Sequence, residues 1–582
     1  MADSNNQDGL NPKPVNMEKN LLIAFVLIGI LMFVYPKLFP PPPQPKPGTP
    51  SATPSALNQS GGSAGQAAAT NPTPPPVTQA AAATPAPPAP NAPNATPEHV
   101  EPHFVVTTDL YRVEFSNQGA TVRSWQLRQF HGNDGKPLEL VNTAAGGDYP
   151  FSLYFKDAKP TSDVNWKWFK QTPDPDNLGV TYEYSDGRTT VRKVFRFQKN
   201  SYLSMVSTEV TLDGKPLPNL IEWRNGFGDF TVASVAANQR TLYFDVTQNK
   251  LVEQGAKAAD KGPLTASGNF SFAGIGDNYF EAVFLPEGAS GMTQVTFSDH
   301  VKSPNEETGQ APFTGVAIAD GNANRFELFV GPKDLDLLAK INPKLEQTVD
   351  FGWLSFLAKP LFLIVNYVND HFVRNFGWSI VLVTIALNFA LFPVKMANMK
   401  SMKKMQALKP QIDAINARYK NIGIRDPRKG DQNQEVMDLY KKHGVNPMGG
   451  CVPMLLQIPF FIAFYKVFTV SVEMRGASWL WVHDLSQPEH IAIRILPIIM
   501  VGSQLAMQLM MPQPGGDPAQ QKMMMVMPLV FGFMFYNFPS GLVLYYLTSN
   551  LVSMGQQWFF NKTSLATVAA ESVLPPKKTG RK

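Results

Sequence analysis

The chain has 582 residues and an almost balanced charge, with 51 Lys and Arg against 46 Asp and Glu, which leaves room for two or three domains. Its single cysteine, Cys451, excludes an internal disulfide framework. The histidines are scattered, and Pro102 interrupts any helix that would bring His99 and His103 together, so the residues give no support for a metal site.

The first 99 residues contain one apolar segment between two polar ones. Residues 1–19 are polar and are expected to be a cytoplasmic N-terminus, whereas residues 20–36 are near the lower length limit of a membrane-spanning helix. The long polar lead and the proline run that follows favour an uncleaved signal anchor, with a cleaved signal peptide as the alternative. Residues 37–99 are rich in Pro and Ala with little charge, so they predict an unfolded linker.

Residues 100–350 change to short alternating runs of Val, Phe, Tyr and Thr separated by Gly, Asn and Asp turns. The clearest runs are 104–106, 111–115, 180–184, 191–197, 202–210 and 326–330. This spacing predicts a large all-β sandwich. Its acids Asp277, Glu281, Asp299 and Glu306 form no pair suited to sugar hydrolysis, and we expect them in solvated loops and turns.

Residues 355–374 have apolar side chains at helical spacing and precede a long apolar stretch, so we expect an amphipathic helix lying at a membrane interface. Packing against the β domain is the alternative. The apolar runs that follow are 376–394, 452–470, 495–511, 523–538 and 542–560. With the signal anchor they predict a polytopic α-helical bundle of six spans, whose last five form a membrane domain over residues 376–560.

Charge predicts the orientation of these spans. The segment 395–442 and the tail 561–582 are basic, whereas the loop 471–491 carries one arginine beside three acids. Because positively charged loops stay inside, we expect the basic segments in the cytoplasm and the β domain on the outer side of the membrane. Residues 396–443 predict a cytoplasmic helical hairpin. Its Met399, Met402 and Met405 form either an adaptable binding face for apolar segments or the packing face between the two helices.

A polar stripe crosses the apolar spans. Thr384, Asn388 and Lys395 fall at i, i+4 and i+11 on one helical face. Further candidates on the other spans are Gln457, Gln504, Tyr545, Tyr546 and Asn550. These groups either join neighbouring helices or line a hydrated cavity that accepts polar peptide segments. No catalytic set or phosphate-binding loop accompanies them, so no enzyme activity and no cofactor are expected.

A solute or ion transporter is the alternative function. It would be expected to carry paired intramembrane acids or an inverted repeat, and the apolar runs contain neither Asp nor Glu.

Four motifs in order resemble the YidC-type membrane protein insertases. They are NPMGGCVPMLLQIPFFIAFY from residue 446, HDLS from 483, DPAQQKMMMVMP from 517 and FPSGLVLYYLTSN from 538. The resemblance covers about residues 356–560, and the anchor, linker and β domain fit the Gram-negative form with its periplasmic β-supersandwich.

The resemblance implies an insertase that needs no nucleotide or metal and acts alone or beside the Sec translocon. Its implied partners are nascent membrane proteins on a translating ribosome and the lipid bilayer, with no sequence-specific nucleic acid binding. It implies a hydrophilic groove open to cytoplasm and lipid, at which Thr384, Tyr545 and Tyr546 fall. The family typically has an arginine where this chain has Asn388. Lys395 is either the replacement charge at the groove mouth or a snorkelling interfacial lysine.

Overall fold

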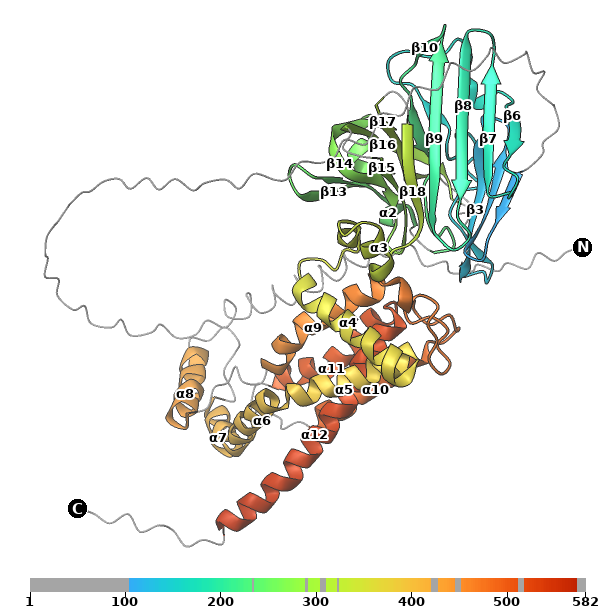
Figure 1. Cartoon of the computed structure of the whole chain (residues 1–582). Coiled ribbons are helices and arrows are strands. Elements are labelled where there is room, and N and C mark those ends of the chain that lie inside the picture. The colour runs from blue at the N-terminus through green and yellow to red at the C-terminus, as the bar shows by residue number, and fades with distance from the viewer. Residues whose placement is uncertain are drawn as a thin grey trace, which may run out of the picture.

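The structure is a computed structural model that describes residues 104–232, 235–287, 291–303, 310–321, 324–419, 428–444, 452–510 and 518–572. The predicted signal anchor, the linker, Glu306 and the first six residues of the motif that begins at residue 446 therefore lie outside the described residues. In Figure 1 the strands form one part of the molecule and helices α4 to α12 form another.

The strand-rich part is a β-sandwich domain of two antiparallel sheets. The described strands of the smaller sheet follow the order β1-β2-β3-β4, and their bounds are Phe104–Thr107, Tyr111–Ser116, Thr121–His131 and Pro137–Glu139. The main path of the larger sheet is β5-β11-β17-β16-β14-β15-β18-β9-β8-β7-β6, with β10 beside β9, and with β12 joining β13 to β14. In chain order, β5 to β18 are Leu153–Tyr154, Lys170–Pro173, Gly179–Ser185, Thr189–Phe197, Leu203–Leu212, Lys215–Pro216, Leu220–Trp223, Arg240–Asp245, Lys250–Gln254, Leu264–Gly276, Phe280–Pro286, Gly291–Lys302, Gln310–Asp320 and Asn324–Pro332. All six predicted runs coincide with strands of these sheets, except that Tyr202 directly precedes β9.

Strand β8 shows why this sequence forms a sandwich. Val191 and Phe195 point inward and are buried, while Arg192 and Arg196 alternate with them and are exposed. Lys193 is the exception on the inner face. Its Nζ donates hydrogen bonds to loop carbonyl oxygens, including those of Gly119 and Phe151 at 2.6 Å each, and burial lowers its pKa to about 7.

Aromatic side chains fill the space between the sheets. The ring centroids of Trp125 and Phe151 lie 6.4 Å apart, and those of Trp125 and Trp223 lie 6.1 Å apart. Large rings bury much apolar area for each ordered residue, so this cluster forms the centre of the domain core.

The expectation that the acids of this domain are solvated is wrong for the three described ones, since Asp277, Glu281 and Asp299 are all buried. Asp299 pairs with Arg224, and the carboxylate of Asp277 accepts backbone N–H groups of the turn that follows it. Glu281 lies 3.9 Å from the ammonium of Lys333, and burial raises the pKa of its carboxyl to about 7. These partners come from distant or bent chain segments that alternation in the sequence does not pair.

The chain leaves the β domain through α3 (Leu335–Ile341) and enters the predicted amphipathic helix, α4 (Ser355–Val368). Phe362 and Val365 are buried on the side that packs on α9 (Val452–Val470), whereas Phe356 is 73% exposed. A π-helical turn, Asn369–Val373, continues α4, and Arg374 ends it in the left-handed conformation.

The remaining helices are α5 (Phe376–Ala390), α6 (Phe392–Ala407), α7 (Lys409–Arg418), α8 (Arg428–Lys442), α10 (Ile495–Met510), α11 (Pro518–Phe535) and α12 (Ser540–Ser572). Among the described residues no single helix combines the length and hydropathy of a membrane span, but Ser355–Val373 and Phe376–Ala390 do so together across a bend of 115°. The apolar helices Leu456–Val470, Ile495–Met510 and Met525–Phe535 are shorter.

Candidate functional site

Helix α5 begins with a side-chain cap and buries one polar edge. The Oδ1 of Asn375 accepts the backbone N–H of Trp378 at 3.1 Å, which satisfies a free donor of the first turn. Ser379, Thr384 and Asn388 then lie on the buried face of the helix. Helix α12 packs along this face, so these polar groups are enclosed by protein.

Asn388 is the centre of the site. Its Nδ2 donates to the carbonyl oxygen of Thr384 at 2.8 Å, and its Oδ1 accepts hydrogen bonds from Lys395 at 2.5 Å and from Ser549 at 3.3 Å. The Nε2 of Gln556 donates to the backbone carbonyl of Asn388 at 3.1 Å. One amide therefore connects α5, α6 and α12.

Lys395 points into this site. Its Nζ donates to Asn388 and, at 3.0 Å, to the Oγ of Ser553 on α12. Both partners are neutral, and no described carboxylate pairs with the ammonium. The ammonium of Lys395 therefore lies directly beside the amide of Asn388, and the choice between a groove charge and a snorkelling interfacial lysine stays a prediction.

A small cavity of about 20 Å³ adjoins these groups, enough for roughly one water molecule. Its lining residues are Leu387, Asn388, Leu391, Lys395, Leu456, Gln457, Phe460, Tyr545 and Ser549. Polar and apolar side chains thus share the wall of the same small cavity.

The predicted stripe divides into two groups. Thr384, Asn388, Lys395, Gln457 and Tyr545 lie around α5, α9 and the face of α12 that carries Ser549. We call this first group, together with Ser549, Ser553 and Gln556, the polar stripe.

The other predicted residues face elsewhere. Asn550 donates to Ser503 of α10 at 3.1 Å, and Gln504 is on the same helix as Ser503. Tyr546 packs on Phe535 of α11, with ring centroids 5.0 Å apart.

Several buried polar atoms of the bundle have no hydrogen-bond partner among the described residues: Thr384 Oγ1, Gln504 Oε1 and Gln556 Oε1. An unpaired buried polar atom costs free energy, so these groups favour the arrival of another polar partner.

Sequence reasoning missed Ser549, Ser553 and Gln556. Each follows Tyr545 at a spacing of four, eight or eleven residues, which places all of them on one face of α12. That periodicity was available in the sequence and identifies the face that meets Asn388.

The predicted helical hairpin corresponds to α6, α7 and α8. Met405 is 3% exposed and clusters with Leu408, Ile412 and Tyr440, with Met402 packed against them. Met405 and Met402 therefore pack between the helices of the hairpin, as the second alternative predicted. Met399 is half-buried and lies outside this cluster.

On the opposite side of the bundle, a buried ion pair joins the helices to the β domain. The Nη2 of Arg475, in the loop after α9, contacts the carboxylate of Asp229, and the two side chains are 5% and 1% exposed. The same nitrogen donates to the carbonyl oxygen of His131 at 3.1 Å, and the guanidinium lies 5.5 Å from the ring centroids of Tyr279 and Phe280. We call these contacts the outer seam.

Two family models match the chain, and together they span both parts of the structure. Residues 103–364 match the YidC periplasmic domain, and residues 368–567 match the 60Kd inner membrane protein family.

Whole-chain relatives agree with these matches. The chain is 36% identical to the membrane protein insertase YidC of Cupriavidus necator over 483 residues, covering 79% of this chain and 82% of that one. It is 32% identical to the membrane protein insertase YidC of Geotalea daltonii over 571 residues, covering 94% and 99%. A crystal structure described as an active YidC insertase with the first transmembrane domain resolved has a TM-score of 0.35 and 20% identity, covering 78% of this chain and 94% of that chain. By its sequence this chain belongs to the YidC family of membrane protein insertases.

Proposed function

We propose that this protein inserts membrane proteins into the bacterial inner membrane. The observation that carries the proposal is the buried polar stripe. Among the described residues, Lys395 is bonded only to neutral groups there, and Thr384 and Gln556 each keep a buried oxygen without a partner. Such groups lower the free energy of a polar peptide segment that would otherwise enter lipid with its backbone unsatisfied.

The proposed topology has six spans: the anchor at residues 20–36 and five in the membrane domain, 376–560. The linker 37–99 and the sandwich 100–350 are periplasmic, the helix 355–374 lies at the interface, and the hairpin 396–443 and the tail 561–582 are cytoplasmic. The positive charge of the segments between and after the spans supports this orientation.

In the proposed mechanism the groove opens where α5, α9 and α12 meet. The cavity now has room for about one water molecule, so a client enters only when these helices separate. Lys395 supplies positive charge beside Asn388, at the position where the family typically carries an arginine, and attracts acidic residues of the crossing segment.

The proposed partners are nascent membrane proteins, the translating ribosome that presents them and the Sec translocon, without nucleotide, metal or other cofactor. Tyr546 is proposed as a groove residue in addition to the polar stripe, which already includes Gln457 and Tyr545. Gln504 and Asn550 are proposed as a second polar group that clients reach later. Met399, with its half-buried side chain, is the proposed client contact on the hairpin, beside Met402 and Met405.

Site-specific crosslinking tests the proposal. A photoreactive residue at Leu391, in the cavity wall, should capture a ribosome-bound nascent membrane protein. The same probe at Phe389, which is 62% exposed on α5 and does not line the cavity, is the matched control for general contact with lipid-embedded segments. Equal crosslinking from both positions, or none from Leu391, would reject the groove.

A further inference from the structure

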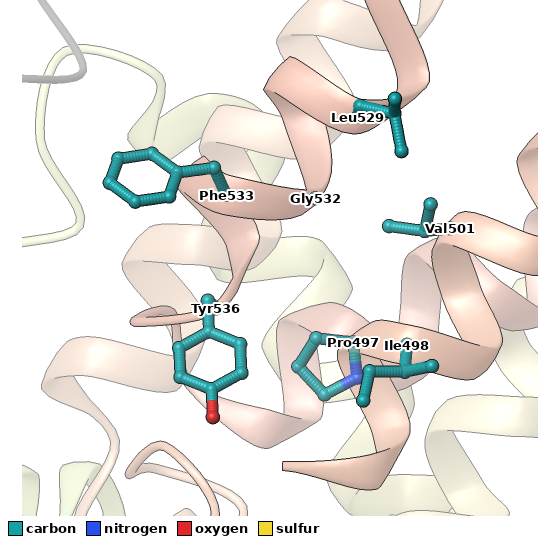
Figure 2. Close-up of a pocket in the computed structure, with 7 residues that line it drawn as sticks. All are labelled: Pro497, Ile498, Val501, Leu529, Gly532, Phe533 and Tyr536. Atoms are coloured by element: carbon teal, nitrogen blue, oxygen red, sulfur yellow. The ribbon is translucent and has the colours of Figure 1, made fainter. Parts of the chain in front are cut away.

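A second, larger concavity lies on the surface of the bundle between α10 and α11. It measures about 450 Å³, and its lining residues are Pro497, Ile498, Val501, Leu529, Gly532, Phe533 and Tyr536. Figure 2 shows side chains of the two helices facing each other across it. We call this concavity the α10–α11 groove.

The floor of the groove exists because the helices approach closely at Gly532. A Cβ built there would lie 2.3 Å from the Cγ2 of Val501, so any larger residue would force the helices apart. The walls remain open, since Ile498 is 54% and Leu529 58% exposed. An exposed apolar groove on membrane helices is suited to a hydrocarbon chain.

Arg494 lies at one end of this groove. Its Nη1 donates to the carbonyl oxygen of Tyr536 at 2.5 Å and to Asn537 at 2.6 Å, and its Nε donates to the carbonyl oxygen of Glu489 at 3.1 Å. The guanidinium also lies 4.8 Å from the ring centroid of Tyr536, which itself lines the groove. All of these acceptors are uncharged.

The guanidinium keeps donors free. Among the described residues its Nη2 has no acceptor and no carboxylate pairs with it. The carboxylate of nearby Glu489 is already occupied by the backbone N–H of Leu496 and by the indole of Trp481. A planar guanidinium with free N–H groups matches the oxygens of a phosphate.

The surroundings of Arg494 are apolar and exposed, unlike those of a water-facing loop. Its neighbours Ile493 and Ile495 are both exposed, and so is Leu480 in the same connection between α9 and α10. Trp481 is also partly exposed. A tryptophan and an arginine beside exposed aliphatic residues are typical of the level of lipid headgroups.

We infer that the α10–α11 groove binds one anionic phospholipid of the outer leaflet. Its phosphate accepts hydrogen bonds from Arg494, and one acyl chain lies in the groove over Gly532. The bound lipid covers the exposed wall of α11. Among the described residues this helix packs mainly on α10, and Phe535 at its end contacts Tyr546 of α12. This inference concerns lipid binding and does not depend on client insertion, although its assignment to the outer leaflet rests on the proposed topology.

Native mass spectrometry of the delipidated full-length protein tests it. Phosphatidylglycerol and phosphatidylcholine of equal chain length are titrated, and the bound fraction is measured without any client. We expect phosphatidylglycerol to bind more tightly, and Arg494→Gln to weaken it about tenfold, because a charge-assisted contact is lost. Arg494→Lys should retain most of the preference. Arg374→Gln, which removes an exposed arginine at the start of α5, is the matched control and should leave binding unchanged.

A second pair of variants tests the acyl chain. Ile498→Trp should fill the groove and weaken both lipids, whereas Ile499→Trp, at an exposed neighbour outside the groove, should not. The inference is overturned if Arg494→Gln binds like the wild type, if the two tryptophan variants behave alike, or if glycerol phosphate competes as well as the intact lipid. The inference is also overturned if Ile498→Trp abolishes crosslinks between the groove and a client but leaves lipid binding unchanged. In that case the groove binds a client helix.

Discussion

At the outer seam, Arg475 and Asp229 bury opposite full charges in direct contact, whereas the polar stripe buries amides and hydroxyls around one cation, Lys395. Removing either partner of a buried ion pair leaves a charge with no compensation, so such a pair tolerates little rearrangement. Neutral groups lose less when they exchange one hydrogen-bond partner for another. The seam should therefore resist rearrangement, whereas the stripe can exchange hydrogen-bond partners at lower cost, as the proposed groove requires.

The largest effect is expected at the seam. Asp229→Ala should lower the free energy of unfolding by about 3–5 kcal/mol, because Arg475 remains buried and its Nε and Nη1 already have no described partner. The double variant Asp229→Ala with Arg475→Met should recover most of this loss. Thermal unfolding of the purified full-length protein measures both.

Arg112→Ala breaks the half-exposed pair with Glu114 on β2 and is the control, with an expected cost below about 1 kcal/mol. If the single variant at Asp229 costs no more than this control, the seam does not hold the two parts together.

The next largest effect is expected from Glu281, which should make the free energy of unfolding depend on pH. Burial raises the pKa of its carboxyl from 4.5 to about 7, so the folded state binds the proton more tightly than the unfolded chain. Stability from this group is therefore present at pH 5 and falls as the pH rises towards 8, by on the order of 3 kcal/mol. Glu281→Gln should remove this dependence.

The measurement is the thermal unfolding midpoint of the wild type minus that of Glu281→Gln. This difference should be larger at pH 5 than at pH 8. Glu209→Gln, at an exposed position of β9 in the same sheet, controls for the loss of a carboxylate. A difference that is constant with pH, or that grows towards pH 8, contradicts the prediction.

Local pattern predicted much of this architecture. Alternation located β-strands such as β8, because side chains on a strand alternate between core and solvent. Helical spacing put Thr384 and Asn388 on one buried face, as observed. Adjacent helical residues face different directions, so Tyr545 and Tyr546 separate onto different neighbours although their chemistry is the same.

Pairing over long separations could not be predicted. Arg475 and Asp229 are 246 residues apart, and neither has a neighbour in sequence that reveals the other. The burial of Glu281 is hidden for the same reason, because its partner Lys333 lies on a different segment. Sequence patterns identify faces of single elements, whereas the identity of the opposing face depends on the assembled fold.

The stripe should show a smaller effect on stability but a large one on function. Asn388→Leu removes the acceptor of Lys395 and Ser549, which we expect to cost about 1–3 kcal/mol. Asn388→Asp keeps an acceptor for both and should retain most activity. The readout is the fraction of a Sec-independent client whose tail becomes protected from protease on the cytoplasmic side. Full activity of Asn388→Leu at normal protein levels would remove the stripe from the mechanism.

The smallest change in stability is expected at Met399 of the hairpin, which lies outside the cluster that buries Met405. Met405→Asp puts a charge into the cluster with Ile412 and Tyr440, so the hairpin should become sensitive to limited proteolysis. Met399→Asp, outside the cluster, should change unfolding by less than about 0.5 kcal/mol yet reduce client insertion. Gln406→Asp, at an exposed position of the same helix, controls for the added charge. If Met399→Asp and Gln406→Asp insert clients equally well, the methionines serve packing alone, and adaptable contact with clients is confined to the membrane domain.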